Sequence, residues 1–413
     1  MVDGFIDTGQ TLDTAVRTEG ARILATLIRT VGSVQIAEDA VQEAAVRALR
    51  DWPHNGVPDE PRAWLTVTAR RVAVDLLRRE GARSAKERAS MTLAAPQSPA
   101  DSVVADDHLR LIFTCCHPAL ALDAQVTLAL RTLCGLSPAQ IAAVLLTSEA
   151  AVSKRLTRTR AKIARACIPY RVPADEDLPL RVAAVCAVLH TSYTIAHSAS
   201  GGEHLTDPDG ARESLRLARL VHGLMPDEPS PMAVLALMLL TESRREARLG
   251  NDGNPVPLAE QDRTLWDTNS IEEGLRLLDE SLRRTGGVAD PYQLQAAIAA
   301  QHSRAASYQE TNWSEIVRLY DLLLSVQPTG PAALARAVAV AESQGAAAGL
   351  REVEQLEVDQ RCLAVRGELL AREGRYDEAI ATTRASLTEA VTAPERRHRD
   401  RRIIEWSAKR FQE

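Results

Sequence analysis

Six cationic side chains gather in the short stretch 149–165, which contains a single acid, Glu149. The cations are Lys154, Arg155, Arg158, Arg160, Lys162 and Arg165. Side chains of this kind neutralise phosphate oxygens and, from within the major groove, donate hydrogen bonds to base edges. The chemistry predicted for the stretch is therefore nucleic-acid binding. The alternative is a solvated basic helix at a domain surface.

Two predicted helices position these cations. Ser137 is suited to the N-cap of the first helix, Pro138 to its first position and Gln140 to the capping-box position. Ser148 can cap the second, cationic helix. The apolar residues that would face a common core are Ile141, Val144, Leu145, Val152, Leu156 and Ile163. Two short helices with a tight turn and a basic second helix are typical of a helix-turn-helix, whose second helix enters the DNA major groove.

A second cationic helix is predicted earlier in the chain, from Pro61 through Arg79, after a polar, proline-rich loop over 53–60. Its basic edge consists of Arg70, Arg71, Arg78 and Arg79, with Trp64 near one end. A cationic helix beside aromatic groups could hold a DNA backbone and take up an unstacked base. Considered alone, such a basic edge is more often a solvated helix face.

The helix before it, predicted from Val34 to Trp52, is amphipathic. Its apolar stripe consists of Ala37, Val41, Ala44, Ala48 and Trp52, spaced by threes and fours. The neighbouring polar face carries Asp39, Gln42, Glu43 and Arg47. Without further context, this face is an ordinary solvated surface with one Glu–Arg pair at i,i+4, worth about 0.2–0.5 kcal/mol.

The composition predicts an all-α protein. The chain of 413 residues is long enough for two or three domains. Hydrophobic residues make up 45 % and aromatic residues only 3 %, and strand-like alternation is almost absent. Because the net charge is -6, a nucleic-acid site must come from local clusters of cations. No phosphate loop or nucleophile motif appears, so an enzyme lacks support and no catalytic residue or cofactor is predicted.

Six cysteines without a Cys-x-x-Cys spacing indicate free thiols in a reducing compartment. Cys115-Cys116-His117 lacks a second ligand pair at zinc spacing, and His190, His197 and His204 are seven residues apart, too far for one ion on a helix. No metal site is therefore predicted. The longest apolar runs are too short to span a bilayer, so we expect a cytoplasmic protein without membrane contact.

Four segments, in this order, resemble an extracytoplasmic-function sigma factor. They are Asp-Ala-Val-Gln-Glu at 39–43, Pro-Arg-Ala-Trp-Leu at 61–65, Ala-Arg-x-x-Ala-x-Asp-Leu-Leu-Arg-Arg at 69–79, and the helix-turn-helix. The resemblance covers about 15–166. It implies a first helical domain that binds core RNA polymerase and the −10 promoter element, and a second that reads the −35 element beyond a flexible linker.

The resemblance also implies roles for individual residues. The positions implied in binding core polymerase are Asp39, Gln42, Glu43 and Arg47. Those implied along the −10 element are Asn55, Trp64, Arg70, Arg71, Asp75, Arg78 and Arg79. Those implied in contacting the −35 element are Ser148, Ala151, Ser153, Lys154, Arg155, Arg158, Arg160 and Lys162.

More than half of the chain follows the helix-turn-helix. We expect domains at 10–82 and 108–168, a flexible linker at 83–107 and a helical extension at 169–413. Within the extension, Pro331–Gly345 and Gln360–Gly374 are alanine-rich helices that end in glycine, 29 residues apart. Each is followed by another helix, as in an irregular tetratricopeptide-like solenoid. The chain thus resembles the sigma-factor subgroup with a long extension of this type, and we expect the extension to control activity, in cis or through a regulatory protein.

One polar segment and one alternative function remain to be weighed. Near Trp266, the polar segment 260–267 is interpreted as a helix start, with Asp262 as a cap and Trp266 in the core, in preference to a docking surface. The alternative function is a helix-turn-helix regulator that senses a ligand or protein through its repeats and does not bind core polymerase. The 39–43 and 61–65 helices disfavour it, since such a regulator needs neither.

Overall fold

The computed structural model describes residues 3–87, 107–145, 147–166, 168–198, 205–250, 252–287, 289–387 and 391–410. The fold is all-α, as predicted: these residues form helices and turns, and the single extended pairing among them is an isolated bridge between Leu249 and Pro255. The chain divides into two compact units, Met1–Ser192 and Tyr193–Glu413. The division falls within one helix, α8 (Val182–His197).

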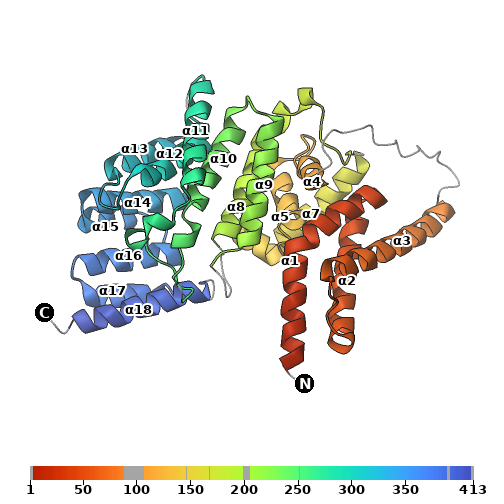
Figure 1. Cartoon of the computed structure of the whole chain (residues 1–413), viewed down its shortest axis with the longest axis horizontal. Coiled ribbons are helices and arrows are strands. Elements are labelled where there is room, and N and C mark those ends of the chain that lie inside the picture. Colours follow the sequence, from red (N-terminus) through yellow and green to blue (C-terminus); the bar gives the residue numbers. More distant parts are fainter. Residues whose placement is uncertain are drawn as a thin grey trace. The chain divides into compact units, whose positions relative to one another are not determined.

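The first unit begins with three long helices, α1 (Asp3–Val31), α2 (Val34–Asn55) and α3 (Pro61–Glu87), coloured red to orange in Figure 1. Each packs against the other two. Small side chains line these contacts, since Ala25, Ala37, Ala40, Ala48 and Ala69 are fully buried. Helix α2 starts where Ser33 accepts a hydrogen bond from the Ile36 amide. The three helices therefore bury one stripe each and leave their polar faces outward.

Two predicted boundaries in this part differ from the structure. Helix α2 continues through Pro53 to Asn55, because a proline in the last turn removes only one backbone hydrogen bond, and Gly56 ends the helix with φ of 83°. Helix α3 continues to Glu87, so residues 83–87 of the predicted linker are helical. Their Ala, Arg, Lys and Glu residues favour helix. The rest of the predicted linker, 88–106, lies outside the described residues.

Four shorter helices follow in the same unit: α4 (Asp107–Cys115), α5 (Leu122–Thr132), α6 (Pro138–Val144) and α7 (Glu149–Arg165). The core of this part includes Leu109, Ile112, Phe113, Leu128 and Ile141, all almost fully buried. Helices α6 and α7 are the two predicted helices of the helix-turn-helix. Both start at the residues that the sequence predicts.

The segment after the helix-turn-helix is bound to the first unit. The Arg181 guanidinium donates to the Phe113 carbonyl at 2.7 Å, and the Thr114 hydroxyl lies 3.5 Å from the Pro169 carbonyl. The Tyr170 hydroxyl donates to the carbonyls of Asp107 at 2.7 Å and Ala25 at 3.1 Å. The predicted extension starts at 169, whereas residues 169–192 belong to the first compact unit.

The second unit continues with α9 (Pro208–Leu224), α10 (Pro229–Glu242), α11 (Thr268–Arg284), α12 (Pro291–Arg304) and α13 (Trp313–Val326). Helix α10 is central, with every residue from Pro231 to Leu240 buried, and it packs against α9, α11 and α12. Helix α10 ends at Glu242, and Asp267, not Asp262, caps α11. Asp262 instead caps a short 3-10 turn, η5 (Arg263–Leu265), and Trp266 is buried as predicted.

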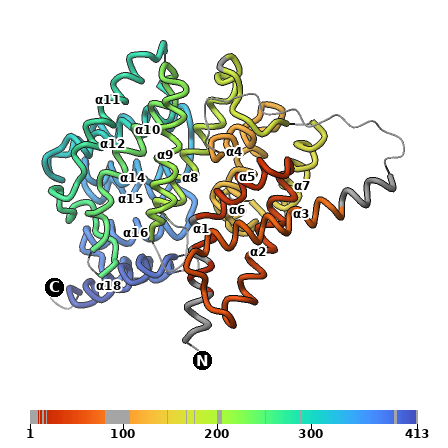
Figure 2. The backbone as a smooth tube through the Cα atoms, turned by 45° about the vertical axis from the view of Figure 1, so that its right-hand side comes forward, coloured from red at the N-terminus to blue at the C-terminus, as the bar shows by residue number. Residues whose placement is uncertain are grey.

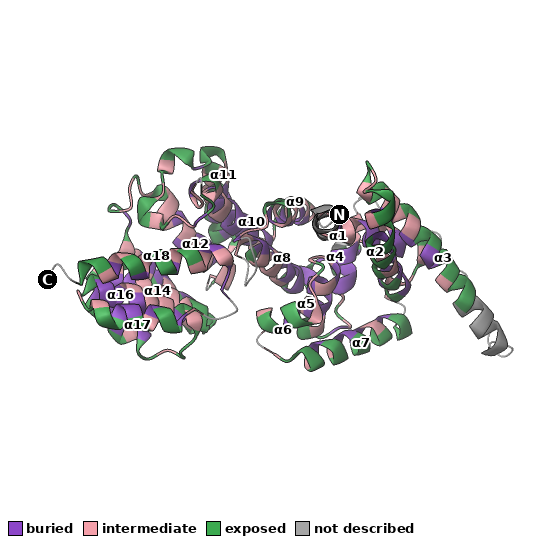
Figure 3. Ribbon diagram, turned by 90° about the horizontal axis from the view of Figure 1, so that it is seen from below, coloured by how far each residue is buried: buried purple, intermediate pink, exposed green. Residues whose placement is uncertain are grey.

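The chain ends in helices stacked in sequence order: α14 (Gly330–Gln344), α15 (Ala346–Val353), α16 (Gln360–Arg372), α17 (Tyr376–Ala385) and α18 (Ala393–Lys409), blue in Figure 2. The two predicted alanine-rich helices are α14 and α16, and glycines with positive φ follow both. At Gly349 of α15, an added Cβ would lie 2.5 Å from the Cβ of Ala341 in α14. Neighbouring helices therefore approach closely, and Figure 3 shows buried residues between α14, α16 and α17.

One helical stretch, Pro179–His197, is long and apolar enough to cross a membrane by length and composition. The sequence predicts that the longest apolar runs are too short to span a bilayer, and this stretch is an exception to that prediction. Half of its most apolar window is buried inside the protein, which is common for a core helix.

Candidate polymerase and promoter interface

Helix α7 carries the predicted DNA-reading cations, and its geometry follows from two caps. The Ser137 hydroxyl accepts from the Gln140 amide at 3.2 Å while the Gln140 side chain accepts from the Ser137 amide at 2.8 Å. This capping box fixes the start of α6. The Ser148 hydroxyl accepts from the Ala151 amide at 3.2 Å and starts α7. Ser148, predicted as a −35 contact, is thus first of all a helix cap.

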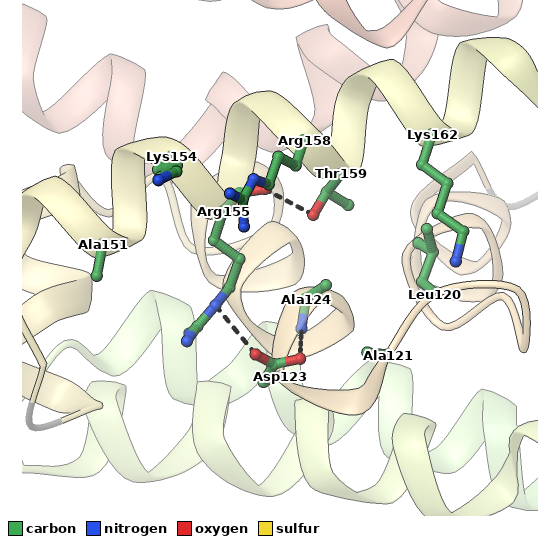
Figure 4. Close-up of a pocket in the computed structure, with 10 residues that line it drawn as sticks. All are labelled: Leu120, Ala121, Asp123, Ala124, Ala151, Lys154, Arg155, Arg158, Thr159 and Lys162. Carbon is green, nitrogen blue, oxygen red and sulfur yellow. Dashed lines mark hydrogen bonds and ion pairs between the residues drawn. The ribbon is translucent and has the colours of Figure 1, made fainter.

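A shallow groove runs between α7 and the start of α5. Figure 4 shows Arg155 and Lys162 projecting from α7 toward the residues that begin α5. The α7 residues that line the groove are Ala151, Lys154, Arg155, Arg158, Thr159 and Lys162, which lie on one face of the helix. Five of the predicted −35 contacts therefore share one face of α7, and four of these are cations.

Arg155 is held in place on this face. Its Nε lies 3.1 Å from a carboxylate oxygen of Asp123, and its Nη1 donates to the Thr127 hydroxyl at 3.1 Å. Asp123 is largely exposed, so the ion pair is worth at most about 1 kcal/mol. Lys154, Arg158 and Lys162 are exposed. Arg155 is therefore positioned by α5, whereas the other three cations extend into solvent.

The remaining two predicted −35 contacts lie on another stripe of α7. Ser153 is exposed, and Arg160, seven residues later, forms an ion pair with Glu38 of α2. Glu38 is almost fully buried and the Arg160 side chain is 24 % exposed. Burial raises the pKa of the Glu38 carboxyl, which the charge of Arg160 opposes. In this arrangement Arg160 faces α2 and not the groove.

The polar face of α2 next to Glu38 holds the residues predicted to bind polymerase. Asp39, Gln42 and Arg47 are exposed, and Glu43 accepts a hydrogen bond from Arg47 at 3.0 Å. Both partners of that pair are nearly half exposed, so it contributes little to stability. The structure thus brings all four residues to one accessible surface.

Helix α3 presents the predicted −10 residues in the same way. Arg70, Arg71, Asp75, Arg78 and Arg79 are all exposed. The four arginines have no acidic partner in the described part of the chain, so the helix carries an uncompensated cationic edge. Such an edge attracts a phosphate backbone.

Two further predicted −10 residues lie at the ends of α2 and α3. Asn55, the last residue of α2, is exposed and donates to Asp51 at 3.3 Å. Trp64 is half-buried and meets the buried Trp52 edge to face, with ring centroids 5.6 Å apart. Trp64 therefore packs on the α2–α3 core with one part of its ring accessible.

The cysteine and histidine residues at 115–117 have structural surroundings. Burial raises the pKa of the Cys115 thiol to about 12, and Cys116 is buried beside it. The His117 ring nitrogen accepts from the Ala119 amide at 3.2 Å. No cluster of three or more metal-ligating side chains occurs among the described residues.

Comparisons with known proteins define the class. The chain matches sigma-70 region 2 over residues 15–83 and sigma-70 region 4 over residues 110–163. A family of unknown function (DUF6596) matches residues 181–282. Region 2 contains α2 and nearly all of α3, and region 4 contains the helix-turn-helix. These regions, in this order, define a sigma-type transcription factor and imply binding to core RNA polymerase and promoter DNA.

Individual relatives indicate the type of sigma factor. An uncharacterized protein of Rhizobium meliloti (strain 1021) is 38 % identical over 403 residues, which cover 94 % of each chain. Two strains of Mycobacterium tuberculosis each have a probable ECF RNA polymerase sigma factor, SigI, that is 32 % identical over 177 residues, 40 % of this chain and 59 % of the relative. Together with the two sigma-70 regions, these partial matches support an extracytoplasmic-function type of sigma factor with a C-terminal extension. No solved structure matches it.

Sequence reasoning missed the residues that connect the sigma regions. Glu38 precedes the predicted polymerase-binding residue Asp39, and the local sequence pattern does not indicate that its side chain is buried. Tyr170 and Arg181 lie after the helix-turn-helix and bond to backbone carbonyls of α1 and α4. Each partner is remote in sequence, so local patterns carry no signal for these contacts.

The ion pair between Glu38 and Arg160 predicts energetic coupling between α2 and α7. In a double-mutant cycle with Glu38→Gln and Arg160→Gln, we expect a coupling of about 1–3 kcal/mol in the free energy of unfolding. Urea denaturation of the four proteins measures it. The matched control is the exposed pair of Glu43 and Arg47, for which the same cycle should give under about 0.5 kcal/mol. Equal, small couplings in both cycles would show that α2 and α7 do not associate.

Proposed function

We propose that this sigma factor directs promoter-specific transcription initiation through three surfaces on its first unit. The polar face of α2 binds core RNA polymerase, the cationic edge of α3 holds the −10 strand, and the groove face of α7 reads the −35 element. The observation that carries this proposal is that region 2 and region 4 each present an exposed face of the required chemistry. The match to region 2 disfavours the alternative of a regulator that acts without core polymerase.

The surfaces differ in charge, as their partners require. Asp39 and Glu43 give α2 acidic groups for a basic partner surface, whereas four arginines of α3 and four cations of α7 face polyanionic DNA. The protein contributes binding and positioning and performs no covalent chemistry. Its partners place it in the cytoplasm.

Arg160 connects these surfaces. While Arg160 is paired with Glu38, its charge is directed at α2, next to the proposed polymerase-binding face. Its predicted −35 contact requires the pair to separate. Separation of a buried ion pair is costly unless both charges find new partners. Binding to polymerase and DNA would supply those partners.

The proposed role of the extension is control of the sigma regions, in cis or with a regulatory protein bound to its tetratricopeptide-like repeats. Its size and stacked helices support this role, because stacked helical pairs present extended surfaces for proteins. The extension then determines when the α2, α3 and α7 surfaces are available, and the sigma regions determine the promoter.

Charge reversal tests the polymerase surface. We expect Asp39→Arg with Glu43→Arg to weaken binding to core polymerase at least tenfold, because acidic groups facing a basic surface become repulsive. Both residues lie on an accessible face, so circular dichroism and the unfolding temperature should change little. Binding is measured by competition for fluorescent core enzyme. The control, Glu357→Arg, reverses an exposed acid of the extension. Unchanged affinity in the double variant would exclude this face.

Alanine substitution tests the groove face of α7. Arg158→Ala should cost about 1–3 kcal/mol of −35 binding if the guanidinium contacts a base, and less if it contacts only phosphate. Reconstituted holoenzyme is titrated with a promoter selected by the wild-type protein. The control is Arg165→Ala at the C-terminal end of α7, because base contacts concentrate near the N-terminus of a recognition helix. Equal losses in the two variants would indicate general electrostatic attraction only.

Truncation tests control by the extension. Tyr170 and Arg181 support the first unit, so the cut belongs after Ser198, which keeps α8 intact. We expect the truncated protein to transcribe at a changed level in a reconstituted assay. A gain indicates autoinhibition, and a loss indicates a required scaffold. Transcription equal to that of the full chain, with equal core affinity, would reject control by the extension.

A further inference from the structure

Four arginines gather at one place in the second unit. Arg244, Arg245 and Arg248 follow the end of α10, and Arg263 begins η5. We call these four residues the arginine cluster. Two of them contact the same indole ring: the Cζ of Arg263 lies 4.4 Å and that of Arg244 5.7 Å from the ring centroid of Trp266. Trp266 is buried, so the cluster lies against the core of the unit.

Carboxylates compensate little of this charge. Arg245 forms an ion pair with Glu242. Arg248 instead donates to the Nδ1 and the carbonyl of His197, at 3.1 and 3.0 Å. Arg263 donates to two carbonyls, those of His302 at 2.7 Å and Ala305 at 2.6 Å.

Of the four arginines, Arg244 has the positive charge that neighbouring groups compensate least. Its side chain has no hydrogen bond or ion pair with the described part of the chain, and the contact that it makes there is the cation–π contact with Trp266. Arg244 is half-buried, and partial desolvation together with the neighbouring Arg248 lowers the pKa of its guanidinium to about 10. Glu310, an exposed acid, acts on Arg263 from outside. The cluster therefore keeps an excess positive charge.

Several polar atoms beside the cluster also lack a hydrogen-bond partner among the described residues. The Nε1 of Trp266, the Nη2 of Arg263 and the Nδ1 of His302 are buried without a hydrogen-bond partner among the described residues. Burial and the neighbouring arginines lower the pKa of His302 to about 4 and that of His197 to about 3, so both are neutral at pH 7. A neutral His302 can donate from Nδ1 in one of its tautomers. Unused donors and uncompensated cations thus occur together.

An anion would satisfy both features. Buried cations and buried donors are costly without partners. The four arginines carry four positive charges against one paired carboxylate, Glu242, and one peripheral acid, Glu310. A dianion offsets this excess better than a monoanion, and guanidinium forks match phosphate oxygens in geometry. We propose that the arginine cluster binds the phosphate group of a small molecule, with Arg244 as its principal ligand and Trp266 Nε1–H as a second donor.

Thermal unfolding of the full chain tests this site with inorganic phosphate, at constant ionic strength set with chloride. We expect the unfolding temperature to rise by roughly 5–10 °C when phosphate is a hundredfold above its Kd. Acetate should give a much smaller rise, and an equal rise would overturn the assignment to phosphate. Phenyl phosphate is the second probe: tighter binding than inorganic phosphate assigns the site to a phosphomonoester, and weaker binding assigns it to free phosphate.

Substitution of Arg244 separates binding from stability. Without phosphate, Arg244→Met should raise the unfolding temperature, because it removes an uncompensated charge, and it should abolish the response to phosphate. The control is Arg212→Met, at an exposed residue of α9, and its unfolding temperature should respond to phosphate as that of the wild type does. A lower unfolding temperature of Arg244→Met in phosphate-free buffer, or an unchanged response to phosphate, would overturn the proposal.

A second variant tests the indole donor independently of Arg244. Trp266→Phe keeps an aromatic ring under Arg263, but it removes the Nε1–H donor and part of the buried ring system. We expect a lower unfolding temperature of the phosphate-free protein, because the smaller ring leaves a cavity, and a Kd for phosphate that rises several-fold as measured by titration below that temperature. An unchanged Kd would exclude Trp266 as a ligand and count against the site. None of these measurements requires polymerase or DNA, so their outcome is independent of the proposed function.

Discussion

Close approach of helices through alanine and glycine is the constraint on which both units depend. With only 3 % aromatic residues, the cores cannot be filled by large rings. Instead Ala25, Ala37 and Ala40 are fully buried between α1, α2 and α3. In the second unit, Gly274 has the Leu240 side chain where a Cβ would lie. Small contact residues bring helix axes together, and in the outer helices, unlike central α10, a narrow stripe then suffices for packing.

The close packing of the helices explains where the proposed binding surfaces lie. Because a narrow stripe suffices for the core, whole faces of α2, α3 and α7 remain free for charged residues. The α3 arginines and the groove cations of α7 share helices with buried alanine, leucine or valine, so the cationic faces are rigidly held without taking part in the core. Rigid presentation matters for DNA binding, since base contacts depend on the position of a helix in the groove.

The sequence predicts the parts of this structure that local patterns determine. Ser137, Gln140 and Ser148 predict both helix starts of the helix-turn-helix, because a cap needs only residues within one turn. The patterns do not reveal α18, whose sequence is dominated by arginines and whose burial rests on Ile403 and Trp406. They also place eight contacts on the recognition helix without separating them, whereas the structure directs Arg160 to Glu38 and Arg155 to Asp123. Such partners come from other helices and are decided by tertiary packing.

Two unusual charges in the described part of the molecule, Glu38 and Arg244, differ in a way that bears on function. Glu38 is buried with a partner from the same chain, so part of its desolvation cost is offset within the folded protein. Arg244 is half-buried, with the Trp266 ring beneath its guanidinium and other arginines beside it. A charge that the chain itself compensates can be explained by folding alone. A charge that the described residues leave uncompensated lowers stability, and an external anion is the simplest agent that removes the cost.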